Sequence, residues 1–179
     1  MPTPDELPEP CASCDAMCCR HYAIFVLPVE LERLAEATGR PPEDLIEVET
    51  HELARDMPAA FLDGVPSQLI LATDDDGEAC GLLDPETNRC TVHGARPYVC
   101  RMYPFAGDPG DPVPIRLRGD IYCPDEFPLD ADGEDDLRRV YLGFWTQDLD
   151  HYRRQVQRWN HGGMPGGLEQ FLAFCRRGV

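Results

Sequence analysis

Apolar positions near the start of the chain follow two different spacings, and together they predict both strands and helices. The run from Tyr22 to Leu27 is almost continuously apolar, which is typical of a buried strand, and Pro28 ends it. The next segment, VELERLAEATG, places its apolar residues near one helical stripe, and Gly39 suits the end of a helix. PPEDLIEVETHELARDM predicts one or two further short helices, with Pro42 in a first turn.

The middle of the chain has a strand-like pattern. QLILAT, CGLLD and RCTVHG are short apolar segments, and the turn sequences DDDGEA and PETN join them. ARPYVCRMYPF then predicts a helix that begins near Pro97. A polar loop, AGDPGDPVP, leads to a last predicted strand in IRLRGDIYCP.

The last third of the chain has helical spacing. DDLRRVYLGFWTQDLDHYRRQVQRWN predicts a long amphipathic helix, and GLEQFLAFCRR predicts a short closing one. The apolar residues on one face of the long helix are Val140, Phe144, Leu149, Tyr152, Val156 and Trp159.

These elements predict an α+β fold with a small, irregular, cysteine-rich metal-binding core of short strands and loops, covered by C-terminal helices. Residues 1–10, which are rich in proline and acids, form a flexible arm. Residues 11–128 form a cysteine-cluster domain, and residues 129–179 form a helical segment packed on the same domain.

Composition narrows the classes of function. A chain of 179 residues is about one domain and buries enough surface to fold without cross-links. The formal net charge of -17, with all basic residues arginine, argues against a nucleic-acid partner. No apolar stretch is long enough for a membrane span, and the first residues lack the pattern of a secretory signal. We therefore expect a cytoplasmic protein with no membrane partner.

Eight of the nine cysteines fall into two sets of four. The first set is the run CASCDAMCC, which contains Cys11, Cys14, Cys18 and Cys19, and the second set contains Cys80, Cys90, Cys100 and Cys123. In a reducing compartment, such clusters are typical of metal sites or redox groups rather than of structural disulfides. Cys175, among phenylalanines on the closing helix, is expected to be a small buried apolar residue.

The spacing C-x2-C-x3-C-C favours a metal site, because one C-x2-C pair lets the chain fold over a metal. Closely spaced thiolates also occur in the iron–sulfur run C-x2-C-x2-C, whereas zinc pairs more often come as separated C-x2-C units. The spacing therefore favours a 4Fe-4S cluster and leaves zinc as the alternative. It does not decide whether there are one or two metal sites.

Arginine and histidine side chains near these cysteines could support the predicted metal centre. Arginines close in sequence to the predicted ligands would offset the negative charge of a thiolate site and tune its reduction potential; they are Arg20, Arg89, Arg96 and Arg101. His93 and His21 could be ligands or neighbours of ligands, although ordinary loop roles are open for both.

CASCDAMCC, CGLLDPETNRCTVHGARPYVCRMYPF and IYCP occur in this order, and the chain from about 11 to 124 resembles the YkgJ-type cysteine-cluster proteins. These are also described as the CxxCxxxCC zinc- or iron-chelating domain. The resemblance implies metal ligation by eight residues: Cys11, Cys14, Cys18, Cys19, Cys80, Cys90, Cys100 and Cys123. A similar cysteine pattern occurs in the flagellin lysine methylase, where it is associated with an iron–sulfur cluster.

Three functions stay open from the sequence. The first is an iron–sulfur protein with a redox, electron-transfer or sensing role and an unknown protein or redox partner. The second is a zinc-chelating structural or interaction domain. The third is a metal-dependent modifying enzyme with an unknown substrate. The chain has no Gly-rich phosphate loop, GxSxG elbow or HExxH motif that would specify a reaction.

Overall fold

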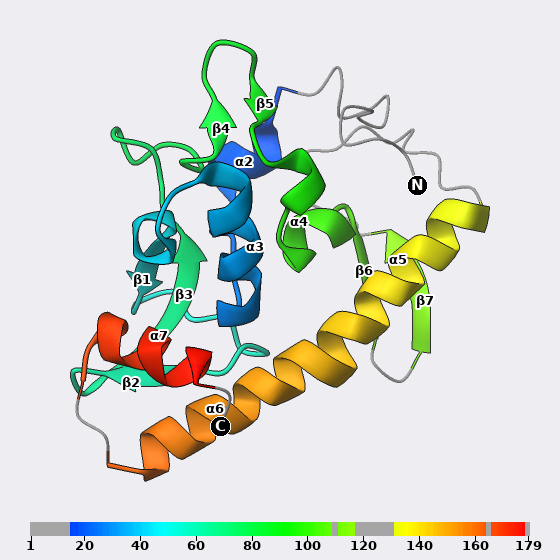
Figure 1. Ribbon diagram of the computed structural model, residues 1–179. Coiled ribbons are helices and arrows are strands. Elements are labelled where there is room, and N and C mark those ends of the chain that lie inside the picture. Colours follow the sequence, from blue (N-terminus) through cyan, green and yellow to red (C-terminus); the bar gives the residue numbers. More distant parts are fainter. Residues whose placement is uncertain (1–14, 109–110, 117–130, 164–165, 178–179) are drawn as a thin grey trace.

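The computed structural model describes residues 15–108, 111–116, 131–163 and 166–177 (Figure 1). Within these ranges, several helices surround small antiparallel sheets, so the predicted α+β class is confirmed. The predicted arm, at residues 1–10, lies outside the described residues, as do Cys11, Cys14 and Cys123.

The largest described sheet has the strand order β1-β3-β2. Its strands are β1 (Ile46–Glu49), β2 (Ala60–Leu62) and β3 (Val65–Leu71), and β3 contains most of the predicted strand QLILAT. The buried strand predicted from Tyr22 to Leu27 is reduced to a single bridge between Phe25 and Ile70. It still follows β3, because Val26 N donates to Leu69 O at 3.1 Å.

Helix α3 (Pro28–Thr38) begins and ends where proline and glycine predict. Gly39 adopts φ 69°, a left-handed conformation that glycine reaches without steric strain, and its N–H donates to Ala35 O. Two positions of the predicted apolar stripe are wrong, because Val29 and Ala37 are exposed. Val29 is 50% exposed, whereas the carboxylate residue Glu30 is only 1% exposed, because Glu30 is held by hydrogen bonds described below.

Two other predictions of local structure are wrong. After the 3-10 turn Pro42–Leu45, the chain forms β1 instead of a second helix, because the backbone pairs with β3 from Ile46 opposite Leu71. The predicted polar loop AGDPGDPVP is partly a hairpin of β6 (Phe105–Asp108) and β7 (Asp111–Arg116). In a two-stranded hairpin both strands are edge strands, where proline is tolerated.

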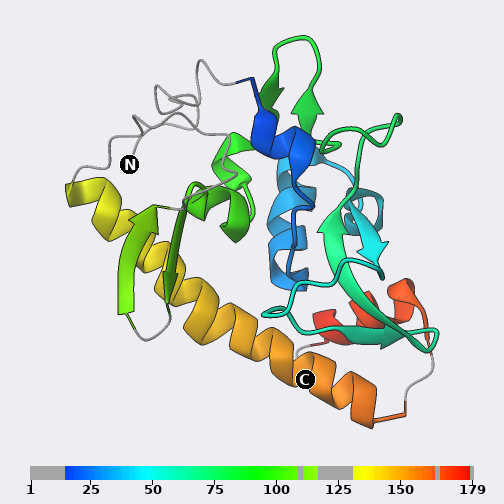
Figure 2. The ribbon, with the colours of Figure 1, turned by 180° about the vertical axis from the view of Figure 1, so that it is seen from behind.

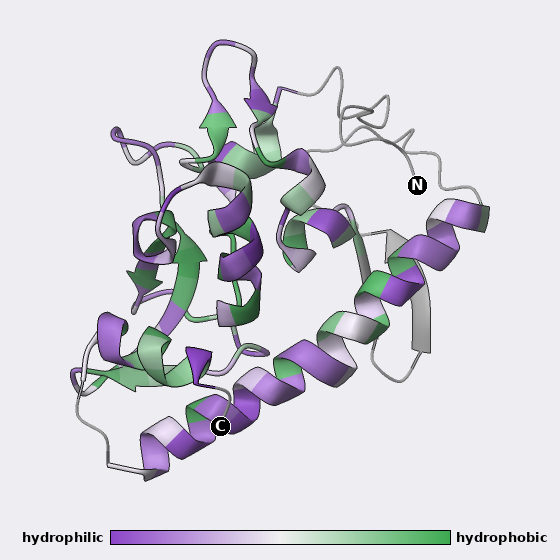
Figure 3. Cartoon of the chain, viewed as in Figure 1, coloured by the Kyte–Doolittle hydropathy of each residue, from purple (hydrophilic) through white to green (hydrophobic). Residues whose placement is uncertain are grey.

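The predicted long helix is continuous over α5 (Ala131–Gly143), the π-helical turn η3 (Phe144–Asp148) and α6 (Leu149–His161). All six residues of its predicted apolar face are buried. The closing helix α7 (Leu168–Arg176) buries Cys175 as predicted and packs near β2 and α3 (Figures 1 and 2). Figure 3 shows that β3 and α7 are largely apolar, whereas the long helix is polar with apolar bands.

The core is aliphatic and aromatic, and the sulfur-bearing residues lie beside it. Leu27, Leu31, Leu34, Leu149 and Phe171 are among its most buried members. Cys80, Cys90 and Cys100 are partly buried and pack against the edge of this core. Among the described helices, none is long and apolar enough to cross a membrane.

Candidate metal centre

Four short segments bring the described cysteines of both sets to one end of the molecule. They are α2 (Met17–His21), the chain around residue 80, the hairpin of β4 (Leu83–Asp84) and β5 (Arg89–Cys90), and α4 (Tyr98–Met102). Figures 1 and 2 show α2, this hairpin and α4 side by side, away from β2 and α7.

Hydrogen bonds between these segments fix their arrangement. Cys80 N donates to Cys19 O at 2.7 Å, which joins the first cysteine set to the second through the backbone. Arg20 Nη2 donates to Asn88 Oδ1 at 2.9 Å and ties α2 to the turn between β4 and β5. The fold therefore brings together cysteines that lie as much as 82 residues apart, from Cys18 to Cys100.

All five of the described predicted ligands line one cavity of about 90 Å³; they are Cys18, Cys19, Cys80, Cys90 and Cys100. His93, Arg89 and Arg96 line the same cavity. Cys18 and Cys100 also line a neighbouring apolar cavity of about 300 Å³, beside Tyr22 and Tyr103. The only other described cysteine, Cys175, lies in the core on α7 and is absent from the described linings of both cavities.

The described thiols share a cavity without forming a finished ligand set. Within the described ranges, no three His, Cys, Asp or Glu side chains stand in an arrangement that could hold a metal ion. Ligation by the eight cysteines therefore stays a prediction.

The adjacent thiols of Cys18 and Cys19 differ in acidity. Their sulfur atoms are 3.9 Å apart and share a hydrogen bond. This hydrogen bond, with help from the positive charge of Arg96, lowers the pKa of Cys18 to about 7, although burial acts against it. The same hydrogen bond and burial raise the pKa of Cys19 well above the ordinary range.

The other three thiols are held in their neutral form by burial. Burial raises the pKa of Cys80 to about 11 and also raises the pKa of Cys90. For Cys100, burial and the neighbouring charges of Cys80 and Cys18 raise the pKa well above its usual value. Several buried thiols that repel each other as anions suit a bound cation, because the cation supplies the missing compensating charge.

The arginines divide into two groups. Arg96 lines the thiol cavity, and its charge acts on the pKa values of Cys18, Cys90 and Cys100. Arg101, only one residue from Cys100, instead lies over the Tyr98 ring, with its Cζ atom 6.0 Å from the ring centroid. Proximity in sequence alone did not distinguish these two arginines.

The two candidate histidines also differ. His93 begins the 3-10 turn η2 (His93–Ala95) and lines the thiol cavity, and its Nε2 atom is buried with no hydrogen-bond partner among the described residues. Burial, followed by the charge of Arg96, lowers the pKa of His93 to about 4. His21 is exposed at the end of α2 and lines another cavity, which Cys19 and Cys80 also line, but it does not line the cavity that all five thiols share.

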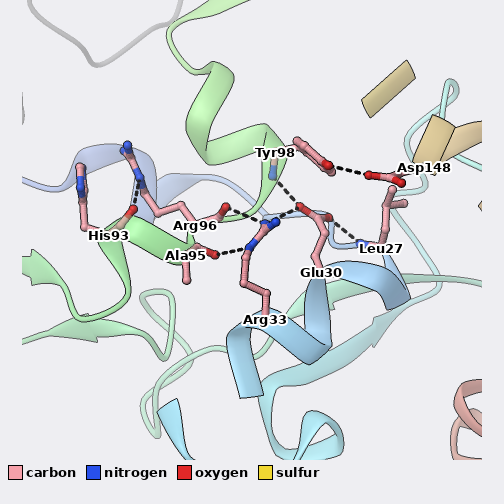
Figure 4. Close-up of polar contacts among 8 residues, drawn as sticks. All are labelled: Leu27, Glu30, Arg33, His93, Ala95, Arg96, Tyr98 and Asp148. Carbon is pink, nitrogen blue, oxygen red and sulfur yellow. Dashed lines mark hydrogen bonds and ion pairs between the residues drawn. The ribbon is translucent and has the colours of Figure 1, made fainter. Parts of the chain in front are cut away.

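A polar clamp that the apolar spacing of α3 did not predict positions the segment leading to Cys100 (Figure 4). Glu30 Oε2 accepts from Leu27 N at 2.8 Å, and Glu30 Oε1 accepts from Tyr98 N at 2.6 Å. Arg33 donates to Ala95 O at 3.2 Å and to Arg96 O at 3.0 Å.

The clamp continues to the long helix, since Tyr98 Oη donates to Asp148 Oδ2 at 2.5 Å. Asp148 belongs to the π-helical turn η3, so this turn sets the position of the acceptor. Burial raises the pKa of Glu30 to about 7, even though its two backbone hydrogen bonds and Arg33 favour the carboxylate. Glu30 is the third residue of α3, a position from which a glutamate side chain can accept from the backbone N–H just before the helix, and this position is a sequence signal for part of the clamp.

Comparison with known families agrees with the cysteine pattern. A model of the CxxCxxCC family, described as a "putative zinc- or iron-chelating domain", matches residues 10–125. This range contains all eight predicted ligands and excludes Cys175. No curated protein and no solved structure matches the chain.

Proposed function

Because the chain belongs to the CxxCxxCC family of zinc- or iron-chelating domains, we propose that its cysteines hold an iron–sulfur cluster of the 4Fe-4S type. The observation that carries this proposal is the cavity that all five described candidate cysteines line. One such cluster takes four cysteine ligands, and Cys11, Cys14 and Cys123 would supply those that the cavity thiols do not.

The chemistry of the donors supports a thiolate-bound metal. Soft sulfur ligands select zinc or iron–sulfur clusters over magnesium and calcium. The Nε2 atom of His93, which has no hydrogen-bond partner among the described residues, is a further polar group in the same cavity that a bound centre would satisfy. The close spacing of the cysteines in the run CASCDAMCC favours iron–sulfur over zinc.

An iron–sulfur cluster supplies one-electron transfer, and the protein side chains set the potential at which it occurs. In this chain, Arg96 stabilises negative charge in the cavity, while burial keeps the thiols away from water. We assign the protein a redox, electron-transfer or sensing role with a protein partner that accepts or supplies the electron.

Anaerobic purification after iron-replete expression tests the proposal. The protein should be brown, with broad absorption near ~400 nm from thiolate-to-iron charge transfer, and acid-labile sulfide should accompany the iron. Reduction should bleach the colour. Colourless, sulfide-free protein with stoichiometric zinc would contradict the iron–sulfur assignment and support the zinc-chelating alternative.

A further inference from the structure

We propose that His93 is a nitrogen ligand of the metal centre and binds through Nε2, which makes the site a mixed cysteine and histidine site. This inference rests on the proposed metal-binding function. It concerns the donor set of that site and holds for either iron or zinc.

The spacing between Cys90 and His93 is the first support. Two residues separate them, as in the C-x2-C pairs that fold over a common metal. Cys90 ends β5, and the chain turns at once into η2, which begins at His93. A strand followed by a tight turn lets both side chains approach the same point.

The backbone around His93 is held in place from two sides. Ala95 N donates to Val92 O at 2.8 Å, which closes the turn. Arg96 Nε donates to the His93 carbonyl at 2.9 Å, so this guanidinium nitrogen contacts the backbone of His93 (Figure 4). The Arg33 contacts to Ala95 O and Arg96 O anchor the same turn to α3.

The buried Nε2 atom is the observation that points to a ligand. A buried polar atom without a hydrogen bond destabilises the folded protein relative to one with a partner. Within the part of the chain that the structure describes, no protein atom satisfies Nε2, although five thiols line the cavity that His93 also lines. Coordination of a metal would satisfy this nitrogen and recruit an additional ligand to the same site.

X-ray absorption at the edge of the bound metal, measured on the anaerobically purified full chain, tests the inference. The wild-type spectrum should contain a sulfur shell together with an imidazole nitrogen shell at about 2.0–2.1 Å. His93→Ala should lose the imidazole shell, and His93→Cys should replace it with an additional sulfur. His21→Ala is the matched control and should keep the wild-type spectrum, because His21 is exposed and does not line the cavity that His93 shares with all five thiols.

A second measurement is available if the centre contains iron. In the reduced protein, 15N-labelled histidine should give a strong hyperfine coupling that His93→Cys removes, even if His93→Ala does not fold. A wild-type spectrum with sulfur ligands alone, or an imidazole shell that persists in His93→Cys, would overturn the inference. If that spectrum is of iron in an iron–sulfur cluster, the proposed function stays intact. A chain without any metal–sulfur shell would overturn the proposed function, and the inference with it.

Discussion

The sheet-and-helix core and the thiol-lined end of the molecule are held together in different ways. The core joins β3 to α3, α6 and α7 through large apolar side chains, and Phe171 contacts the rings of Tyr152 and Trp159. The thiol-lined end is built from α2, the β4–β5 hairpin and α4, whose helices have five residues each and whose strands have two. Such short elements contribute little stability alone, so this end depends on cross-links between segments.

Removal of the metal should have the most different effects on the two regions. If a bound metal joins α2, β5 and α4, an anaerobic chelator should lower the unfolding midpoint and greatly reduce hydrogen-exchange protection in residues 16–21 and 80–102. Protection in β1 and β3 should change much less. Exchange followed by mass spectrometry makes this measurement, and equal protection of both regions after verified metal removal would contradict a structural role for the metal.

A cavity introduced into the core should lower the stability of the protein without changing its metal content. Phe171 is fully buried, so Phe171→Ala should reduce the free energy of unfolding by about 3–5 kcal/mol. Denaturant titration measures this change, and Val29→Ala on the half-exposed face of α3 is the control with a small expected effect. At temperatures where Phe171→Ala remains folded, its metal content should equal that of the wild type.

The Glu30 clamp connects the two regions and should give an intermediate effect. Glu30→Gln places an amide donor against backbone N–H donors and should destabilise the protein by about 1–3 kcal/mol at neutral pH. Thermal unfolding of the variant and the wild type gives the difference, and a change within error would show that the clamp is not a source of stability.

The clamp also predicts a pH dependence. The pKa of Glu30 is raised from 4.5 to about 7 in the folded protein, so the unfolded chain loses this proton at lower pH than the folded chain does. The contribution of Glu30 to stability should therefore be greatest below pH 4.5, fall between about pH 4.5 and 7, and stay constant above that range. The stability difference between wild type and Glu30→Gln should vary across this window, and a difference independent of pH would contradict the raised pKa.

Replacement of either arginine near Cys100 should have a smaller effect, on the reduction potential of the centre, and the two replacements should differ in its size. Arg96 lines the thiol cavity, whereas Arg101 lies over the Tyr98 ring. Arg96→Gln should lower the reduction potential of the centre by more than Arg101→Gln does, because loss of a nearby positive charge destabilises the reduced form. Redox titration of both variants makes the comparison, and equal shifts would contradict the assignment of Arg96 to the centre.

Periodicity predicted the elements that depend on local sequence. Gly39 ended α3 where expected, and the apolar face from Val140 to Trp159 is buried. Periodicity could not predict that Glu30 is buried and Val29 exposed, because the partner of Glu30 Oε1 is Tyr98 N, 68 residues away. The segment after Pro42 likewise became β1 through its pairing with β3.

For the candidate site, too, some features could be predicted from the sequence and others could not. Spacing grouped the cysteines and separated Cys175, because ligand spacing is a local property of the sequence. The different surroundings of Arg96 and Arg101, and of His93 and His21, depend on side-chain direction in the folded chain. A pattern in sequence does not contain that information.

Metal content in a set of matched cysteine variants tests the central claim most directly. Cys90→Ser and Cys100→Ser change thiols that line the cavity, whereas Cys175→Ser changes a thiol in the core. We predict that the first two variants, purified without oxygen, lose most of the metal per chain and that Cys175→Ser keeps the wild-type amount. Wild-type metal content in all three variants, or loss in Cys175→Ser alone, would contradict the assignment of this cavity as the metal centre.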